Sequence, residues 1–259
     1  MKKTMISIGN FLFKHRNYLF PIYILVLFLI FMPPSSEPGT GLMRIVALLL
    51  AFAGLAVRAV VIGYAYIKRG GVGKKVYADD LVVEGMFSIC RNPLYVGNML
   101  IYAGEFLMFG NLAVFIIGVL SFWFIYECII AAEENYLRNK FGAKYDAYCK
   151  EVPRWRLLLG RFGEAKKGMS FNIKRVFQKD YSTMLSTIAV LAAIEFWRLA
   201  TNGIQADEQG NVSFLIAAVA VLVIAASLIR FFKKKESAKR DQTIKAAQAA
   251  EAEGMKAPE

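Results

Sequence analysis

The feature that most limits what this chain can fold into is a series of long, continuously apolar stretches. A helix needs ~20 mostly apolar residues to cross the hydrocarbon core of a bilayer, and several stretches approach that length. The whole chain is 57% hydrophobic, with a mean hydropathy of +0.43. Because the runs are continuous rather than alternating, they exclude a transmembrane β-barrel. The sequence therefore predicts an all-α, polytopic transmembrane helical protein.

About six spans follow from this length rule. They are expected at residues 18–32, 43–67, 94–109, 112–132, 183–199 and 212–232. Residues 1–17 combine basic side chains with apolar ones at helical spacing. That pattern predicts a short helix that lies in the membrane interface ahead of the first span.

Basic residues are distributed unevenly along the chain, whose net charge is +12. Residues 33–39 and 201–211 contain no Lys or Arg, whereas residues 68–75 and 133–182 are rich in them. Since cytoplasmic loops carry the excess of Lys and Arg, both termini and residues 133–182 are expected in the cytoplasm. The charge therefore fits a multi-pass protein of a bacterial or archaeal cell membrane, or of the endoplasmic reticulum, and predicts no nucleic-acid partner.

Three parts are expected along the chain. Residues 1–182 form a membrane core whose cytoplasmic lobe, residues 133–182, presents apolar residues on one side of a helix: Leu137, Phe141, Tyr145 and Tyr148. Residues 183–235 read as an accessory transmembrane hairpin, a candidate homodimer contact. Residues 236–259 are rich in Ala, Glu and Lys, which predicts a frayed or disordered cytoplasmic tail.

Metal and phosphate sites are not predicted. The chain has one histidine and three cysteines, without the spacing of a zinc or haem site. Cys90, Cys128 and Cys149 are expected to be free thiols near cytoplasmic ends. The glycine-rich residues 70–73 lack the Gly-Lys-Ser/Thr that opens a helix in a phosphate-binding loop, so they favour a solvated loop.

Two polar motifs flank the hairpin formed by the third and fourth spans, which turns at Gly110-Asn111. The first runs from Gly85 to Gly97 and contains Arg-Asn-Pro at residues 91–93. The second begins at Glu133-Glu134 and ends with Val-Pro-Arg at residues 152–154. Because a hairpin returns both motifs to one membrane face, they predict a site for a charged, water-soluble cofactor beside a lipid-phase substrate.

Together the two motifs resemble the integral-membrane methyltransferase superfamily, which includes isoprenylcysteine carboxyl methyltransferases and phospholipid N-methyltransferases. The resemblance runs from about residue 58 to residue 154 and implies S-adenosylmethionine bound in a cytoplasmic pocket. It implies roles in catalysis or cofactor binding for Arg91, Asn92, Pro93, Tyr95, Gly97, Glu133 and Glu134. Arg91 and Glu134 are the catalytic candidates.

Elementary chemistry agrees with these assignments. The guanidinium of Arg91 suits the cofactor carboxylate, and Glu133 or Glu134 suits its ammonium or ribose hydroxyls. The aromatic faces of Tyr95 and Tyr148 suit a sulfonium by cation–π attraction, so Tyr148 joins the cofactor-binding candidates. Methyl transfer requires little beyond alignment and a deprotonated nucleophile, so proximity is the main catalytic resource.

Structural roles stay open beside the functional ones. Pro93 suits the first position of a helix, and Arg91 could fix that helix entry or bind lipid headgroups. Glu133-Glu134 could be a solvated helix end. Two charges fall inside spans: Arg58 would need an acidic partner or a place in the substrate cavity, and Glu105 is either functional or reaches water at the outer end.

Two departures from the superfamily bear on the acceptor. Asn92 stands where many members have His, and Asn cannot act as an acid or base near neutral pH. Residues 122–132 contain no basic side chain, whereas carboxyl methyltransferases carry an Arg shortly before the Glu pair. This weighs against an isoprenylcysteine carboxylate and leaves an amine, phosphate or thiol acceptor open.

The sequence thus predicts an S-adenosylmethionine-dependent methyltransferase that acts on a membrane lipid or lipophilic acceptor. One alternative is an oxidoreductase similar to the sterol reductases, which would use a nicotinamide cofactor. A small transporter is the other alternative, although no pair of Gly/Pro-broken helices recurs in two halves.

Overall fold

Helices make up all the regular structure in the residues that the computed structural model describes, namely 2–31, 40–64, 81–202 and a few positions between 216 and 230. The chain divides into two compact units, Met1–Ile204 and Gln205–Glu259. The few described positions of the second unit are helical. The all-α prediction is confirmed over this part of the chain. The expected loops at 33–39 and 68–75, residues 203–211 of the loop expected at 201–211, most of the span at 212–232 and the tail lie outside the described residues.

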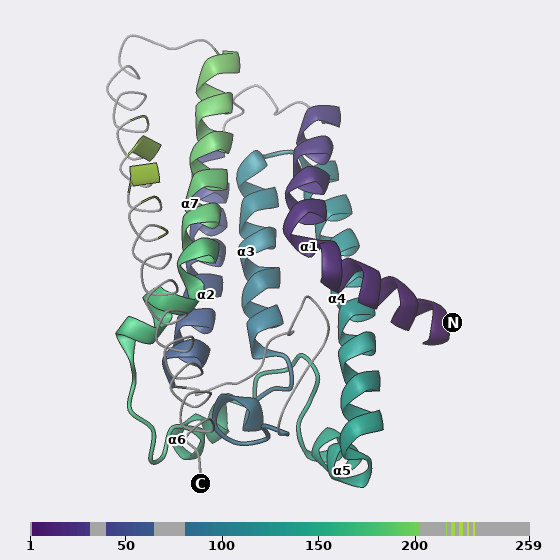
Figure 1. The fold of residues 1–259 in the computed structure, drawn as a ribbon. Helices are drawn as coiled ribbons and strands as arrows, with labels where there is room; N and C mark the ends of the chain where they lie inside the picture. The colour runs from purple at the N-terminus through teal and green to yellow at the C-terminus, as the bar shows by residue number, and fades with distance from the viewer. Residues whose placement is uncertain are drawn as a thin grey trace, which may run out of the picture. The chain divides into compact units, whose positions relative to one another are not determined.

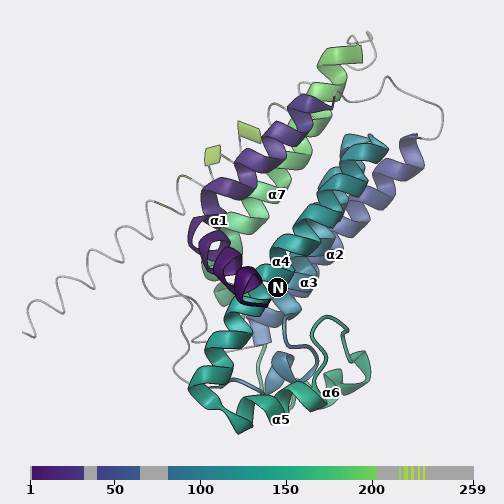
Figure 2. The same cartoon turned by 90° about the vertical axis from the view of Figure 1, so that its right-hand side faces the viewer.

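Five long helices of the first unit run side by side (Figure 1). They are α1 (Lys2–Ile30), α2 (Thr40–Tyr64), α3 (Pro93–Phe109), α4 (Leu112–Phe141) and α7 (Ile173–Asn202). Shorter elements gather beyond one end of these helices, as Figure 2 shows for α5 and α6. These are η1 (Gly85–Ser88), α5 (Ala143–Glu151), η2 (Leu159–Arg161) and α6 (Phe162–Ala165).

Among the helices in the described ranges, α1, α2 and α4 are long and apolar enough to cross a membrane. The helix α3 packs between α2 and α4, and α7 packs on α2 and α3. Aromatic side chains fill the centre of this bundle, among them Phe20, Phe106, Phe122 and Tyr126. The predicted count of six spans and the orientation of the termini stay predictions.

The N-terminal region forms one helix, so the expected break between a helix at residues 1–17 and the first span is absent, while the interfacial position of residues 1–17 stays a prediction. α1 runs unbroken from Lys2 to Ile30 because no helix-breaking residue lies at the junction between residues 17 and 18. Pro21 lies inside α1, and a proline removes a helical hydrogen bond and crowds the preceding turn. Figure 1 shows α1 bent away from the bundle toward its N-terminus.

The turn between α3 and α4 lies where the sequence predicts it. Gly110 ends α3 with φ of 82°, in the left-handed region that glycine favours. Asn111 then caps α4, because its Oδ1 accepts hydrogen bonds from the backbone N–H groups of Ala113 at 2.9 Å and Val114 at 3.4 Å. The hairpin therefore returns the end of α4 toward the start of α3.

The helices α2 and α3 meet along a row of small residues. A Cβ on Gly97 would lie 2.6 Å from Cγ of Arg58 and 2.9 Å from the carbonyl oxygen of Gly54. A Cβ on Gly104 would lie 2.6 Å from the carbonyl oxygen of Ala47. Small residues let membrane helices approach this closely, so this row sets the spacing of α2 and α3.

The helix α4 continues past the predicted end of its span at residue 132 and carries both Glu133 and Glu134. It ends at Gly142, where φ of 51° breaks the chain before α5. The single lobe helix of the prediction is therefore two helices. Their apolar side does form as predicted, since Leu137, Tyr145 and Tyr148 are buried together with Val152.

The helix α7 begins at Ile173 rather than at residue 183 and runs through the predicted boundary between the core and the accessory hairpin. Its Leu191 and Ile194 are buried in the same apolar cluster as α1, α3 and α4. The first part of that hairpin is thus packed within the first unit. Its separate role stays a prediction.

Candidate functional site

The two sequence motifs are joined by backbone hydrogen bonds. The N–H of Arg91 donates to the carbonyl of Pro153 at 2.9 Å, and the N–H of Leu158 donates to the carbonyl of Ile89 at 3.1 Å. The carbonyl of Arg154 accepts from the Asn92 side-chain amide at 3.1 Å and from the Cys90 thiol at 3.3 Å. The segment after α5 is therefore fixed beside the segment that opens α3.

Asn92 and Pro93 start α3. The carbonyl of Asn92 accepts from the N–H groups of Tyr95 at 3.0 Å and Val96 at 3.1 Å, while its side chain makes no capping bond. Pro93 occupies the first turn, where its missing N–H costs nothing. The structural role that the sequence left open for Pro93 is confirmed, and the Asn92 side chain holds Arg154 in place.

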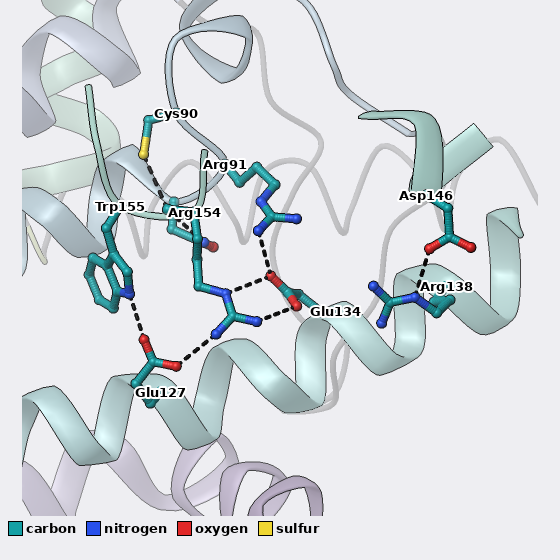
Figure 3. A network of polar contacts seen from close by, with 9 residues as sticks. Cys90, Arg91, Glu127, Glu134, Arg138, Asp146, Arg154 and Trp155 are labelled. Atoms are coloured by element: carbon teal, nitrogen blue, oxygen red, sulfur yellow. Dashed lines mark hydrogen bonds and ion pairs between the residues drawn. The ribbon is translucent and has the colours of Figure 1, made fainter. Parts of the chain in front are cut away.

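An ion network lies at this junction, where α4 faces the two joined segments (Figure 3). Arg154 donates to Oε1 of Glu134 from Nε at 3.0 Å and to Oε2 from Nη2 at 2.6 Å. Its Nη1 donates to Oε2 of Glu127 at 2.7 Å. The planar guanidinium thus joins two carboxylates that lie two turns apart on α4, and its bidentate contact with Glu134 is the geometry that favours Arg over Lys.

Arg91 also approaches this carboxylate of Glu134. Its Nη2 lies 3.5 Å from Oε1 of Glu134, and only 13% of its side chain is exposed. The Nε of Arg91 is buried and has no hydrogen-bond partner among the residues that the structure describes. Buried donors are normally satisfied, so this atom is available to an acceptor that the described residues do not supply.

Glu133 forms a separate contact on α4. Its Oε1 accepts from the hydroxyl of Tyr95 at 2.9 Å. The ring of Tyr95 packs on Tyr126, with centroids 4.9 Å apart. The two glutamates predicted as a pair therefore have different partners: Glu134 binds the arginines, and Glu133 binds the first turn of α3.

Two predicted site residues lie away from the ion network. The hydroxyl of Tyr148 donates to the carbonyl of Phe87 at 2.8 Å, and its ring lies in the apolar cluster with Leu137. Gly97 lies against α2, where Gly54 and Arg58 leave no room for a side chain. These contacts give Tyr148 and Gly97 packing roles in the structure. Their predicted cofactor contacts stay predictions.

The pKa shifts around the network favour its ionic form. Burial disfavours the charge on Arg154, but the hydrogen bonds and charges of Glu134 and Glu127 outweigh burial and raise the pKa of this guanidinium. Tyr145 is buried near Glu134, and burial followed by the Glu134 charge raises the pKa of its phenol. Tyr145 therefore stays neutral, and the permanent charges come from the Arg and Glu residues.

The sequence motifs contained Arg154 without giving it a role, and Glu127 was only noted near the end of its span. Arg154 reaches back to the stretch of α4 where residues 122–132 contain no basic side chain of their own. The guanidinium of Arg154, which follows the Glu pair in sequence, therefore lies in space beside the part of α4 that precedes this pair. This guanidinium is occupied by Glu134 and Glu127, so the weighing against a carboxylate acceptor stays a prediction.

The two charges inside predicted spans have different surroundings. Arg58 pairs with Asp180 of α7 and donates to Oδ1 of Asn98 at 2.5 Å, so the predicted acidic partner exists. Glu105 is 3% exposed, and its Oε2 has no partner among the described residues. The suggestion that Glu105 reaches water is wrong, because the bundle encloses it.

Comparison with known proteins agrees with the motifs. The profile of the phospholipid methyltransferase family matches residues 42–144, which include the α3–α4 hairpin and both catalytic candidates. A protein-S-isoprenylcysteine O-methyltransferase of Schizosaccharomyces pombe is 34% identical over 73 residues, 28% of this chain and 31% of the relative. The chain is therefore similar, over these residues, to members of the integral-membrane methyltransferase superfamily. Its three long apolar helices and this similarity indicate an integral membrane protein.

Longer matches are to proteins named for metal resistance. A cobalt-zinc-cadmium resistance protein of Cupriavidus metallidurans is 30% identical over 148 residues, 57% of this chain and 66% of the relative. A nickel-cobalt-cadmium resistance protein of Alcaligenes xylosoxydans is 27% identical over 146 residues, 56% of this chain and 66% of the relative. No group of His, Cys, Asp and Glu in the described residues has the arrangement of a metal site. No solved structure matches the chain.

Proposed function

We propose that this chain is an S-adenosylmethionine-dependent methyltransferase of this superfamily that acts at the membrane on a lipid or lipophilic acceptor. The observation that carries the proposal is the buried Nε of Arg91, which has no hydrogen-bond partner among the described residues. The backbone N–H of Arg91 donates to the carbonyl of Pro153 at 2.9 Å, and its guanidinium faces Glu134. An anion-binding donor is thereby placed beside a carboxylate, at the junction of the two superfamily motifs.

These residues fit the polar end of the cofactor. A carboxylate would satisfy the unpartnered Nε of Arg91 by a charge-assisted hydrogen bond. Glu134, whose two oxygens already accept from Arg154, retains lone pairs for an ammonium or a hydroxyl. When bound, the cofactor supplies an electrophilic methyl group on a sulfonium, and the transfer leaves a neutral thioether.

The residues of the network hold the reacting partners in place. Arg154 fixes Glu134 against rotation, because two hydrogen bonds and a bridge to Glu127 determine the orientation of that carboxylate. Arg91 is fixed by its backbone bond to Pro153. An arrangement of this kind contributes by proximity and orientation, the effect on which a displacement at a methyl group depends most.

Binding measurements on the full chain test the proposal. S-adenosylmethionine and its demethylated product should both raise the thermal midpoint, whereas NADPH should not. Arg91→Ala should weaken cofactor binding roughly tenfold or more in calorimetry, since a hydrogen bond to a charged group is worth about 1.5–3 kcal/mol. Arg156→Ala is the matched control, because Arg156 is an exposed arginine near the site. Stabilisation by NADPH alone, or equal affinity in the Arg91→Ala variant, would reject the proposal.

A further inference from the structure

Two tryptophans from different segments stack beside the ion network. Trp123 lies on α4, and Trp155 follows Arg154 in the segment after α5. Their ring centroids are 4.8 Å apart, with 22° between the ring planes. The indole Nε1 of Trp155 donates to Oε1 of Glu127 at 2.6 Å (Figure 3). The pair therefore joins an apolar surface to the ion network.

Trp123 belongs to an exposed apolar face of α4. The exposed side chains recur at helical spacing and include Ile116, Leu120, Trp123 and Phe124, with exposed fractions of 47%, 63%, 45% and 53%. This face ends where charge begins, because Glu127 is the next charged residue along the helix and is followed by Glu133 and Glu134. In a membrane span, an exposed apolar face contacts lipid, and the first charges mark the boundary with water.

We propose that the Trp123–Trp155 pair lies in the membrane–water interface and anchors the segment after α5 to the bilayer. Tryptophan favours this level, because its ring is apolar and its N–H finds a polar partner. Trp155 has both features here, with its ring on Trp123 and its N–H on Glu127. The partner is the headgroup region of the lipid bilayer, continuous with the apolar face of α4.

This position limits the acceptor, a step that rests on the proposed function. Helical rise is about 1.5 Å per residue, so Glu127 lies ~6 Å and Glu134 ~16 Å beyond Trp123 along α4. Methyl transfer at the ion network is therefore open to a nucleophile carried on the polar head of an amphiphile. A nucleophile within the hydrocarbon core would not reach it. The Trp pair is a positioning element for that acceptor.

Depth-dependent fluorescence quenching tests the membrane position without any activity. The chain has three tryptophans, so Trp197→Phe leaves Trp123 and Trp155 as its only indoles. The full-length variant in phosphatidylcholine vesicles should be quenched more by a nitroxide near the ester carbonyls than by one near the chain ends. Stronger quenching by the deep nitroxide would overturn the proposal. So would quenching by aqueous acrylamide with no effect of either lipid label.

Kinetics test the positioning role separately. Trp155→Ala should raise the KM for a lipid acceptor roughly three- to tenfold, the range expected for losing one aromatic contact, with unchanged cofactor affinity in calorimetry. Trp155→Phe keeps the ring without the N–H and should recover most of that loss. A fall in kcat or in cofactor affinity with no change in KM would overturn the positioning role. If the tryptophans are quenched at the interface but the protein binds no S-adenosylmethionine, the proposed function is rejected and the membrane position of the Trp pair stands.

Discussion

Asp180 on α7 binds the guanidinium of Arg58 on α2 with both carboxylate oxygens, across 122 residues of sequence. Nε of Arg58 lies 3.0 Å from Oδ2, and Nη2 contacts Oδ1 and the hydroxyl of Thr183. Asp180 is 1% exposed. A charge inside the bundle thus has a full set of partners, and α7 is tied to α2 at the level where α3 begins.

Removing Asp180 should strongly destabilise the fold. Asp180→Ala leaves the Arg58 guanidinium buried without its counter-charge, and breaking one partner of a buried pair costs on the order of 3–5 kcal/mol. The thermal midpoint in nanodiscs should fall clearly, while Lys179→Ala, an exposed neighbour, should change it little. The double variant Arg58→Met with Asp180→Leu should recover much of the loss. A midpoint for Asp180→Ala equal to that of Lys179→Ala would show that the pair contributes nothing.

The substitution Gly97→Ala distinguishes a packing role of Gly97 from a role in cofactor binding. A Cβ added in Gly97→Ala meets the backbone carbonyl of Gly54 at 2.9 Å, so α3 must move away from α2. Overpacking of this kind costs about 1–3 kcal/mol. Gly163→Ala is the control, because a Cβ there meets nothing within 4 Å. We expect a lower thermal midpoint for Gly97→Ala with calorimetric cofactor affinity as in the wild type. Normal stability with lost affinity would instead support the cofactor role predicted from the motif.

The Cys90 thiol should lose its proton at a higher pH than an ordinary cysteine. Burial raises the pKa of its thiol from 9.0 to about 11, although the Asn92 backbone and the Arg91 charge act in the opposite direction. Because the folded pKa is the higher one, stability from this group is complete below pH 9 and is lost as the pH rises through 11. In the double variant Cys128→Ser with Cys149→Ser, reaction with a small thiosulfonate reagent should increase near pH 11. In denaturant it should increase near pH 9, and identical profiles would contradict the shift.

The sequence was a good guide to elements whose signals are local. The Gly110-Asn111 turn and Pro93 at the start of α3 depend on nearest neighbours, and both were placed correctly. The end of α4 was missed, because Glu133 and Glu134 look like the close of a span. The helix nevertheless continues until Gly142 breaks it with a positive φ. The length of α1 was missed because its charged first half resembles a separate interfacial helix.

The sequence predicted the site residues that the two motifs contain, but not the contacts that these residues make with distant segments. Arg91 and Glu134 are brought together as expected. The bidentate partner of Glu134 was not anticipated, since the pairing depends on how the segment after α5 folds back onto residues 89–92. Asp180 was missed for the same reason: nothing in its local sequence identifies Arg58 as its partner. Contacts between distant segments follow from packing, which a single sequence does not contain.

The orientation of the protein in its membrane remains a prediction from charge. Residues 33–39 and 201–211 contain no Lys or Arg, while the segment between α4 and α7 is rich in both. Lys166 lies in that segment and is exposed, and its ammonium group lies over the ring of Phe162. The positive-inside rule places it in the cytoplasm, with the ion network on the same side.

Cysteine labelling with a membrane-impermeant maleimide checks this orientation. Cys90 and Cys128 are buried, so Cys149→Ser supplies a background of low reactivity. In that background, Ser36→Cys and Gln209→Cys should be labelled on intact cells, because their loops have no basic residue to retain them inside. Lys166→Cys should be labelled only after the cells are permeabilised. Labelling of Lys166→Cys on intact cells would invert the orientation and place the Arg91–Glu134–Arg154 network outside, where a cytoplasmic methyl donor could not reach it.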